Sequence, residues 1–226
     1  IHDAWKLARL VKHTPVLDGS GLKHTLEREV VQFLQAQGFE LRDKKVLMTA
    51  AVDRFGMAEA LTAAGCRMVF GDLIFGLGLP IPLTSLDALR TIAHLLLPVL
   101  TRLPFALLYP TGEKQEKIHP RFSRYYEEAD LIAGDFLFIK RHLPPELSGK
   151  MILTNTVTAA DLDELAKRKL KTLVTTTPDF QGRSFGTNVM EALLVAFSGR
   201  PPEDLTEEDY LYYLQQLEIK PRIINF

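Results

Sequence analysis

Short runs of apolar residues alternate along this chain with longer segments in which apolar residues recur every three or four positions. Continuous apolar runs of this length are typical of strands in a parallel sheet that is covered on both faces. The sequence predicts such strands, in chain order, at 15–18, 45–51, 67–72, 130–135, 150–155 and 171–176.

Helical periodicity lies between these strands. It predicts helices at 26–34, 57–64, 86–97, 159–169, 189–197 and 210–217. Gly38 and Gly65 follow the first two helices at the position where a left-handed C-terminal residue is favoured. Polar residues at 158–161 and at 206–209 have the spacing of a capping box, so a helix is expected to begin at each.

The alternation of strands and helices predicts a doubly wound α/β fold, with a mostly parallel sheet and helices on both faces in a Rossmann-like, three-layer arrangement. We expect one ligand-binding domain over residues 1–200, in which 1–110 and 111–200 could form two halves. Residues 201–226 are expected to form a C-terminal helix and a tail that pack on this domain.

Composition narrows the range of partners. The chain has 226 residues, 24% of them charged, and a net charge of −1, so no overall basic field indicates nucleic acid or an acidic membrane surface. The longest apolar stretch, 92–108, is interrupted by proline and arginine and is unsuited to a membrane span. A single cysteine, Cys66, excludes an intrachain disulfide framework. It favours a reducing, cytoplasmic location, and a homo-oligomer is compatible with the sequence.

The most informative polar segment, 175–188, links a predicted strand to a predicted helix. Free N–H groups and the positive end of the helix dipole meet at such a junction and favour an anionic ligand. We therefore predict a small-molecule site for a phosphate or carboxylate here. The residues expected to contact the anion are Arg183, Ser184, Gly186, Thr187 and Asn188.

The segment 49–58 occupies the position of a dinucleotide-binding loop, although it is not G-x-G-x-x-G. Gly56 would permit close approach of a cofactor, and Arg54 beside Asp53 would meet its pyrophosphate. Asp72 ends the next strand, where an acidic residue binds ribose hydroxyls. The alternative is that Asp53 caps the helix and Arg54 is solvated.

The polar segment 109–117 offers acid–base chemistry. Lys114 could supply positive charge or a proton, and Glu113 could act as a general base. An exposed charged loop is the alternative that composition favours.

The ends of the later strands form a polar rim with Asp135, Asn155 and Thr176, which could orient a hydroxylated or phosphorylated ligand or could cap the following helices. The glycine-containing turn 18–24 could likewise cradle an anion. No histidine or cysteine spacing indicates a metal site.

These segments together resemble a bacterial family usually described as quinate 5-dehydrogenase. The resemblance covers nearly the whole chain and is carried by 15–23, 51–60, 109–117, 133–135, 154–158 and 182–191. It implies oxidation of quinate at a ring hydroxyl with NAD or NADP. Members are longer at the N-terminus, so we expect residues before Ile1. A G-A-G-G loop, present in quinate and shikimate dehydrogenases, is replaced here by 50–56.

Three functions stay open at this point. The first is an NAD(P)-dependent oxidoreductase, in which Lys114 or Asp135 handles the hydroxyl proton and Arg183 holds the substrate carboxylate. The second is a module that binds a nucleotide or a phosphometabolite without turnover. The third is a non-redox enzyme that acts on a phosphorylated substrate.

Overall fold

The computed structural model describes residues 6, 8–100, 118–180 and 183–226, without the side chains of 96–100, 180 and 183. In these ranges the helices are α2 (Ser20–Ala36), α3 (Phe55–Ala63), α4 (Leu86–Leu100), α6 (Ser123–Glu128), α7 (Phe136–Arg141), α8 (Ala159–Lys167), α9 (Thr187–Ser198) and α10 (Glu207–Gln216). The strands are β1 (Lys45–Met48), β2 (Arg67–Phe70), β3 (Leu131–Ala133), β4 (Met151–Thr154), β5 (Thr172–Thr175), β6 (Asp179–Phe180), β7 (Arg183–Ser184) and β8 (Arg222–Asn225). Short helical turns are η1 (Val52–Arg54), η2 (Asp72–Gly76) and η4 (Pro202–Asp204).

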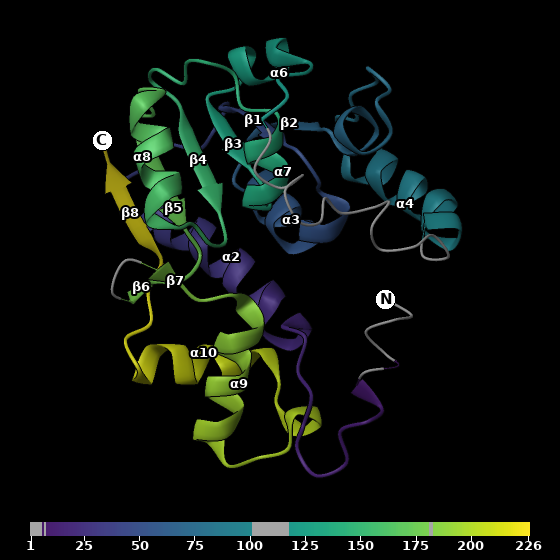
Figure 1. The fold of residues 1–226 in the computed structure, drawn as a ribbon, viewed down its shortest axis with the longest axis vertical. Coiled ribbons are helices and arrows are strands. Elements are labelled where there is room, and N and C mark those ends of the chain that lie inside the picture. Colours follow the sequence, from purple (N-terminus) through teal and green to yellow (C-terminus); the bar gives the residue numbers. More distant parts are fainter. Residues whose placement is uncertain (1–5, 7, 101–117, 181–182) are drawn as a thin grey trace.

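Six strands form one sheet in the order β2-β1-β3-β4-β5-β8 (Figure 1). The first five are parallel, as predicted, and β8 pairs antiparallel with β5. The predicted strand at 15–18 is wrong, because this segment has no sheet partner in the structure. The C-terminal tail, which we expected to pack on the domain, joins the sheet itself, because Arg222–Asn225 forms β8 beside β5.

The direction of strand addition reverses between β1 and β3. The chain places β2 on one side of β1 and then crosses to build β3, β4 and β5 on the other side. In an open α/β sheet, the crevice at the carboxyl ends of two such strands is the usual ligand position. The backbone is tightly closed there, because Gly134 has a φ of 139° and an added Cβ would lie 2.9 Å from Thr49 Oγ1.

Helices cover both faces of the sheet, which confirms the three-layer fold. Val46 and Met48 of β1 pack with α2, α3 and α4 in one core cluster. Leu47 points to the opposite face and packs with residues of α6, α7 and α8 in a second cluster. This alternation buries both faces of the short strands and explains their continuous apolar runs.

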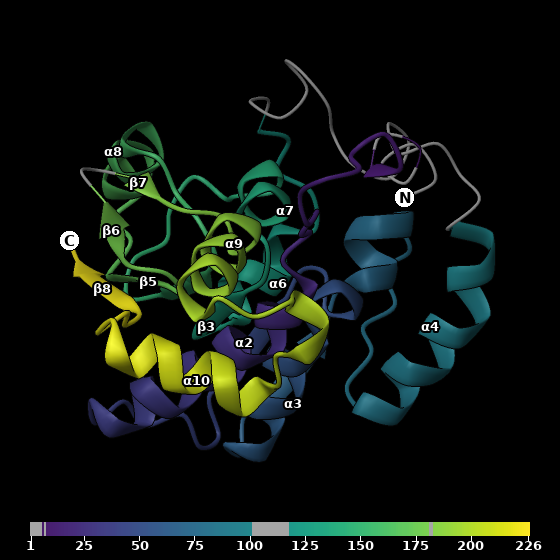
Figure 2. The same cartoon turned by 90° about the horizontal axis from the view of Figure 1, so that it is seen from below.

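A helical lobe lies at one end of the sheet and is formed by α9, α10 and the first half of α2 (Figures 1 and 2). Leu22 and Leu26 of α2 pack there with Met190 of α9 and Tyr210 of α10. The second half of α2 packs on the sheet instead. Helix α2 therefore joins the lobe to the sheet and brings α9 beside the carboxyl edge.

Helix termini follow the sequence signals closely. Thr158 with Asp161 and Thr206 with Asp209 form complete capping boxes at α8 and α10. Gly38 and Gly65 have φ values of 82° and 84°, as expected at helix ends. The six-residue helices α6 and α7 and the hairpin β6–β7 were not predicted, because none is long enough to show a hydrophobic period.

Candidate functional site

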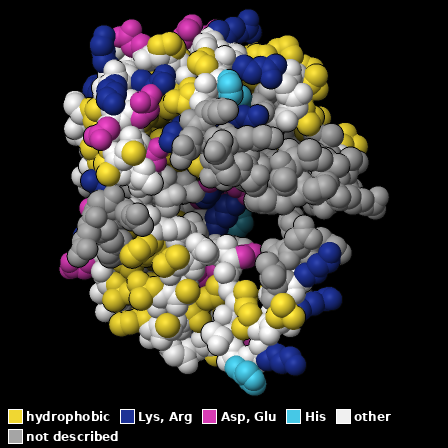
Figure 3. Space-filling view, viewed as in Figure 1, with side chains coloured by type: hydrophobic (Ala, Val, Ile, Leu, Met, Phe, Trp, Pro, Cys, Tyr) yellow, Lys and Arg dark blue, Asp and Glu magenta, His cyan; other side chains and the backbone are white. Residues whose placement is uncertain are grey.

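Three polar segments that are distant in sequence meet where the lobe joins the sheet: the turn before α2, the junction between β1 and α3, and the start of α9. Figure 3 shows the molecule hollowed between its upper and lower parts, with Lys, Arg and His side chains visible in the hollow. An added Cβ on Gly19 would lie 2.9 Å from the backbone nitrogen of Asn188, so the turn before α2 packs directly on the start of α9. We call this region the hollow.

Arg54 is the centre of a buried ion network beside the hollow. Its guanidinium lies 3.4 Å from Glu27 Oε1 and 3.1 Å from Asp135 Oδ2. Burial alone would lower the pKa of Arg54, but the carboxylates of Glu27 and Asp135 more than offset it and hold the pKa above its ordinary value. Arg54 is therefore held inside the protein by two acids, in contrast to the solvated alternative.

Glu27 of α2 occupies the N-terminus of α3. Its Oε2 accepts a hydrogen bond of 3.2 Å from the backbone N–H of Met57. An added Cβ on Gly56 would lie 2.9 Å from the same oxygen. A dinucleotide-binding loop places its pyrophosphate at this helix terminus. In this arrangement the residues do not fit a pyrophosphate there, because a carboxylate of the chain already fills the position.

Asp72 closes the same junction from the end of β2. Its two carboxylate oxygens accept hydrogen bonds from the backbone N–H groups of Ala51 and Val52, at 3.1 and 2.9 Å. Burial raises the pKa of Asp72, while these two hydrogen bonds oppose the rise. Asp53 pairs with Lys23 at 2.9 Å. The predicted cofactor-binding side chains Asp53, Arg54 and Asp72 thus form ion pairs or hydrogen bonds within the protein. Their contact with a cofactor stays a prediction.

The predicted rim of polar strand ends forms in part. Asn155 Nδ2 donates to Asp135 Oδ2 at 2.9 Å, and this oxygen also accepts from Arg54. Asp135 caps α7 through Leu137 N. Thr176 is buried, and its neighbour Thr177 donates to the carbonyl of Phe185 at 3.1 Å. The rim therefore ties the carboxyl ends of β3, β4 and β5 to the segment that leads into α9.

The start of α9 differs from the other strand-to-helix junctions. Gly186 is its N-cap residue and supplies no side chain, and no described residue accepts a hydrogen bond from the N–H of Thr187 or Asn188. Ser184 is occupied nearby, because its Oγ accepts from Val157 N at 3.0 Å. The side chain of Arg183 lies outside the described residues. Within the described residues, the N–H groups of Thr187 and Asn188 therefore lack an acceptor.

Glu191 fixes the turn before α2 against α9. Its two oxygens accept from Gly19 N at 2.7 Å and Gly21 N at 3.0 Å, and Tyr210 donates to it at 3.3 Å. Burial raises the pKa of the Tyr210 hydroxyl to about 12, and the carboxylate of Glu191 adds to the rise. A carboxylate thus neutralises the N-terminus of α2, whereas no carboxylate of the described residues caps α9.

The structure brings together Arg54, Asp135 and Asn155 directly, with Asp53 beside Arg54. The other predicted residues that are described lie on the neighbouring segments: Gly56, Asp72, Thr176, Ser184, Gly186, Thr187 and Asn188. Lys114 and Glu113 lie outside the described residues. Sequence reasoning missed Glu27 and Glu191, whose carboxylates accept hydrogen bonds from the N-termini of α3 and α2. Both lie within helices, and nothing in a helical period distinguishes a buried carboxylate from a solvated one.

One buried polar atom at the β1 end has no partner. The hydroxyl of Thr49 is inaccessible to solvent and forms no hydrogen bond with a described residue. Such an atom usually costs free energy unless a water or ligand supplies a partner. No group of three or more His, Cys, Asp or Glu among the described residues is arranged to hold a metal ion.

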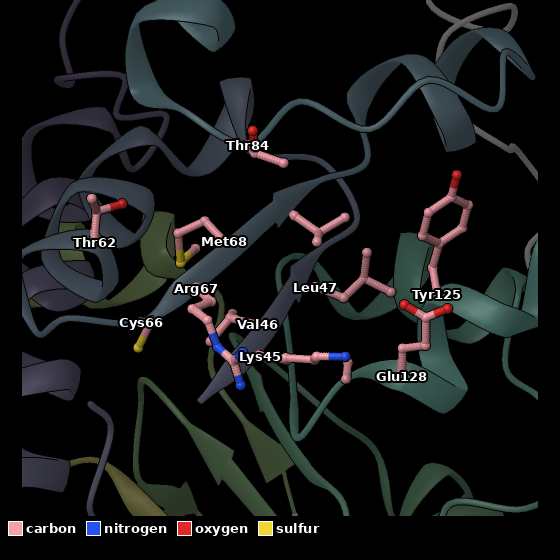
Figure 4. Close-up of a pocket in the computed structure, with 12 residues that line it drawn as sticks. Lys45, Val46, Leu47, Thr62, Cys66, Arg67, Met68, Thr84, Tyr125 and Glu128 are labelled. Atoms are coloured by element: carbon pink, nitrogen blue, oxygen red, sulfur yellow. The ribbon is translucent and has the colours of Figure 1, made fainter. Parts of the chain in front are cut away.

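A separate cavity of about 420 Å³ lies beside the edge strand β2, at the amino ends of β1 and β2 (Figure 4). It is lined by Lys45, Cys66, Thr84, Tyr125 and Glu128, among others. Burial raises the pKa of Cys66 to about 11, and its Sγ donates to the carbonyl of Leu41. The thiol therefore has a structural role, and this cavity lies at the opposite end of the strands from the hollow.

Helix α9 also carries an exposed apolar stripe. Val189, Leu193 and Phe197 recur every four residues and are 47%, 45% and 59% exposed. Hydrophobic side chains gather over the helical lobe in the lower part of Figure 3. Within the described residues, no helix has the length and apolar character needed to span a membrane. The homo-oligomer and the cytoplasmic location stay predictions.

The fold and the hollow together define a doubly wound α/β protein with polar residues at the carboxyl edge of its sheet. Over residues 21–226 the sequence matches the family described as "Domain of unknown function (DUF8754)", and the chain belongs to this family. No curated protein matches the chain. A crystal structure from Mycobacterium smegmatis is similar with a TM-score of 0.35 and 12% sequence identity, covering 91% of this chain. This chain spans 58% of that protein's length.

Proposed function

We propose that this protein binds a small anionic molecule, a nucleotide or a phosphorylated metabolite, in the hollow between the sheet and the helical lobe. The observation that carries the proposal is the start of α9, where no described side chain caps the helix and the backbone nitrogen of Asn188 lies beside the turn at Gly19. Helix N–H groups and the helix dipole favour a phosphate or carboxylate at such a position.

The surrounding geometry supports a hydroxyl-bearing ligand. Asn155 and Thr187 lie on segments that border the hollow, and Lys23 of α2 lies beside it in an ion pair with Asp53. Arg183 leads into α9 in the sequence and is proposed as the residue that pairs with the anion. A ligand that binds at the start of α9 leaves the junction between β1 and α3 unchanged, with Glu27 and Asp72 still bound to its backbone N–H groups.

NAD(P)-dependent oxidation of a polyhydroxy acid such as quinate is the second candidate. The reversal of strand order between β1 and β3 favours it, because doubly wound proteins bind their cofactors at such a point. In this reading Asp135, Lys114 and Glu113 are the candidates for proton transfer. Glu27 would have to leave the N-terminus of α3 before a pyrophosphate could bind there, so the geometry supports the first candidate better.

A thermal-shift titration separates the two candidates. The chain is titrated with NAD, NADP, quinate, shikimate, mononucleotides and sugar phosphates. A ligand present at a hundred times its Kd stabilises a protein by about 2.7 kcal/mol, which corresponds to a rise in Tm of roughly 5–10 °C for a chain of this size. We expect this rise with a mononucleotide or sugar phosphate. A rise confined to NAD or NADP would contradict the proposal and support the dehydrogenase.

A further inference from the structure

A second cavity of about 680 Å³ lies on the other face of the sheet from α3, between the turn η2 and the end of α7. A cavity of this volume suits a small molecule. Its charged and titratable lining residues are all basic: His119, Arg121, Arg141 and His142. We call it the basic pocket.

The basic pocket carries two arginines, Arg121 and Arg141. Neither guanidinium forms an ion pair with a carboxylate of the described residues, and Arg121 instead lies over the ring of Phe122 at 5.5 Å. The charges of both arginines lower the pKa of His142, which lines the same pocket. Clustered cations without a carboxylate repel one another, and an anion in the pocket would remove this repulsion.

His142 supplies an independent indication of a ligand. Only 5% of the residue is exposed, and its Nε2 is buried without a partner among the described residues. Its Nδ1 lies 3.1 Å from the carbonyl of His119, so the ring donates through Nδ1 and leaves Nε2 as a bare acceptor. Burial lowers the pKa of His142, which keeps the ring neutral. An acceptor of this kind in a pocket wall is satisfied by an N–H or O–H donor.

Aromatic rings form the rest of the wall. Phe75 packs against His142 with ring centroids 5.1 Å apart and meets Phe122 edge to face at 6.2 Å. The loop beside Phe75 contains Gly76 and Gly78, whose Cα atoms face open space. The pocket therefore combines two guanidinium groups with a wall that carries the aromatic rings of Phe75 and Phe122.

We propose that the basic pocket is a second binding site, separate from the hollow, for a phosphate monoester that carries an aromatic ring, of the size of a mononucleotide. The arginines bind the phosphate, because guanidinium groups match its oxygens bidentately. The phenylalanine wall contacts the ring, and the amino group of a base can donate to His142 when it reaches the wall.

The test is an NMR titration of the ¹⁵N-labelled full chain with AMP, adenosine and inorganic phosphate. We expect saturable shifts of the backbone amides at 74–78, 119–122 and 141–142 with AMP, and affinities at least about tenfold weaker for adenosine and for phosphate, since each lacks one half of the ligand. Equal affinity for adenosine and AMP would overturn the role of the arginines.

Matched variants complete the test. Arg121→Gln/Arg141→Gln is expected to weaken AMP binding at these amides at least about tenfold, because two charged hydrogen-bond donors are lost. The control Arg42→Gln/Lys44→Gln makes the same change in net charge at exposed residues of the loop before β1 and should leave the affinity unchanged. Absence of saturable shifts in the wild type, or equal loss in both double variants, would overturn the proposal.

Discussion

The junction between β1 and α3 and the start of α9 look alike in sequence but differ in the structure. Each combines small residues, a glycine and an arginine before a helix. At the first junction, the backbone N–H groups donate to the carboxylates of Glu27 and Asp72. At the second, no described side chain caps the helix. An anion site is therefore decided by what distant parts of the chain bring to a helix terminus, as much as by the loop itself.

The closed junction should be sensitive to loss of its cation. Arg54→Met removes the guanidinium and leaves Glu27, which is 1% exposed, without its main partner. Removing one partner of a buried ion pair costs about 3–5 kcal/mol, so we expect a loss of stability of that size in chemical denaturation at pH 7. The double variant Arg54→Met/Glu27→Gln should recover much of the loss, because the isolated charge is gone. Equal losses in the single and double variants would contradict the role of the pair.

The same variant has a characteristic pH dependence. Burial already raises the pKa of Glu27 in the folded wild type, and loss of Arg54 should raise it further. A folded state with a raised carboxyl pKa binds its proton more tightly than the unfolded chain, so its stability falls as pH rises through that pKa. The stability difference between Arg54→Met and the wild type should therefore shrink as pH falls. Denaturation series from pH 7 down to the acid limit of the wild type measure it.

A substitution at the start of α9, the open junction, should change the affinity for the ligand. Asn188→Asp places a negative charge in the first turn of α9 without changing side-chain size. We expect ligand affinity to fall at least about tenfold, because repulsion replaces favourable helix donors. The same carboxylate should stabilise the free protein by about 0.3–1 kcal/mol, since it complements the helix dipole. Isothermal titration and denaturation measure the two effects, and Asn225→Asp, in β8, is the matched control. A fall in affinity equal to the control's would contradict the site.

Removal of the N-cap side chain of α8 should have a smaller effect on stability than loss of Arg54. Thr158→Ala removes one half of the capping box of α8, in which Thr158 and Asp161 bind each other's backbone N–H. We expect a loss of about 1 kcal/mol in stability and no change in ligand affinity. A change in affinity would show that α8, and not α9, contributes to the site.

The smallest effect is expected at the end of β1. Thr49→Val replaces a buried hydroxyl without a partner by a methyl group of the same shape. The stability of the free protein should change by less than about 1 kcal/mol, toward higher stability, because a polar atom without a partner is removed. A loss of more than this in urea denaturation would show that the hydroxyl has a partner in solution.

The fold class, most strands and the helix caps could be predicted from the sequence. Strands from Lys45 to Thr175 and the capping boxes at Thr158 and Thr206 depend on residues near one another, so they could be predicted. The edge strand β8 could not, because Arg222–Asn225 becomes a strand only by pairing with β5. Short, late elements of this kind take their conformation from tertiary contacts.

The site was predictable only in part, for the same reason. Asp135 and Asn155 follow strands, and parallel strands bring their carboxyl ends to one edge, so their proximity follows from the fold class. The positions of Glu27 and Glu191 depend on how α2 and α9 pack across the molecule. No local pattern encodes that packing, so the closed and open junctions could not be told apart before the structure.

The most direct test of the open junction is an NMR titration of the labelled chain with the ligand found by thermal shift. An anion at the start of α9 should move the amide resonances of Thr187, Asn188 and Gly19 with one common saturation curve. The amides of Ala51, Val52 and Met57, which Asp72 and Glu27 already hold, should not move with it. Saturable shifts at Ala51, Val52 and Met57 without shifts at α9 would contradict the proposed site.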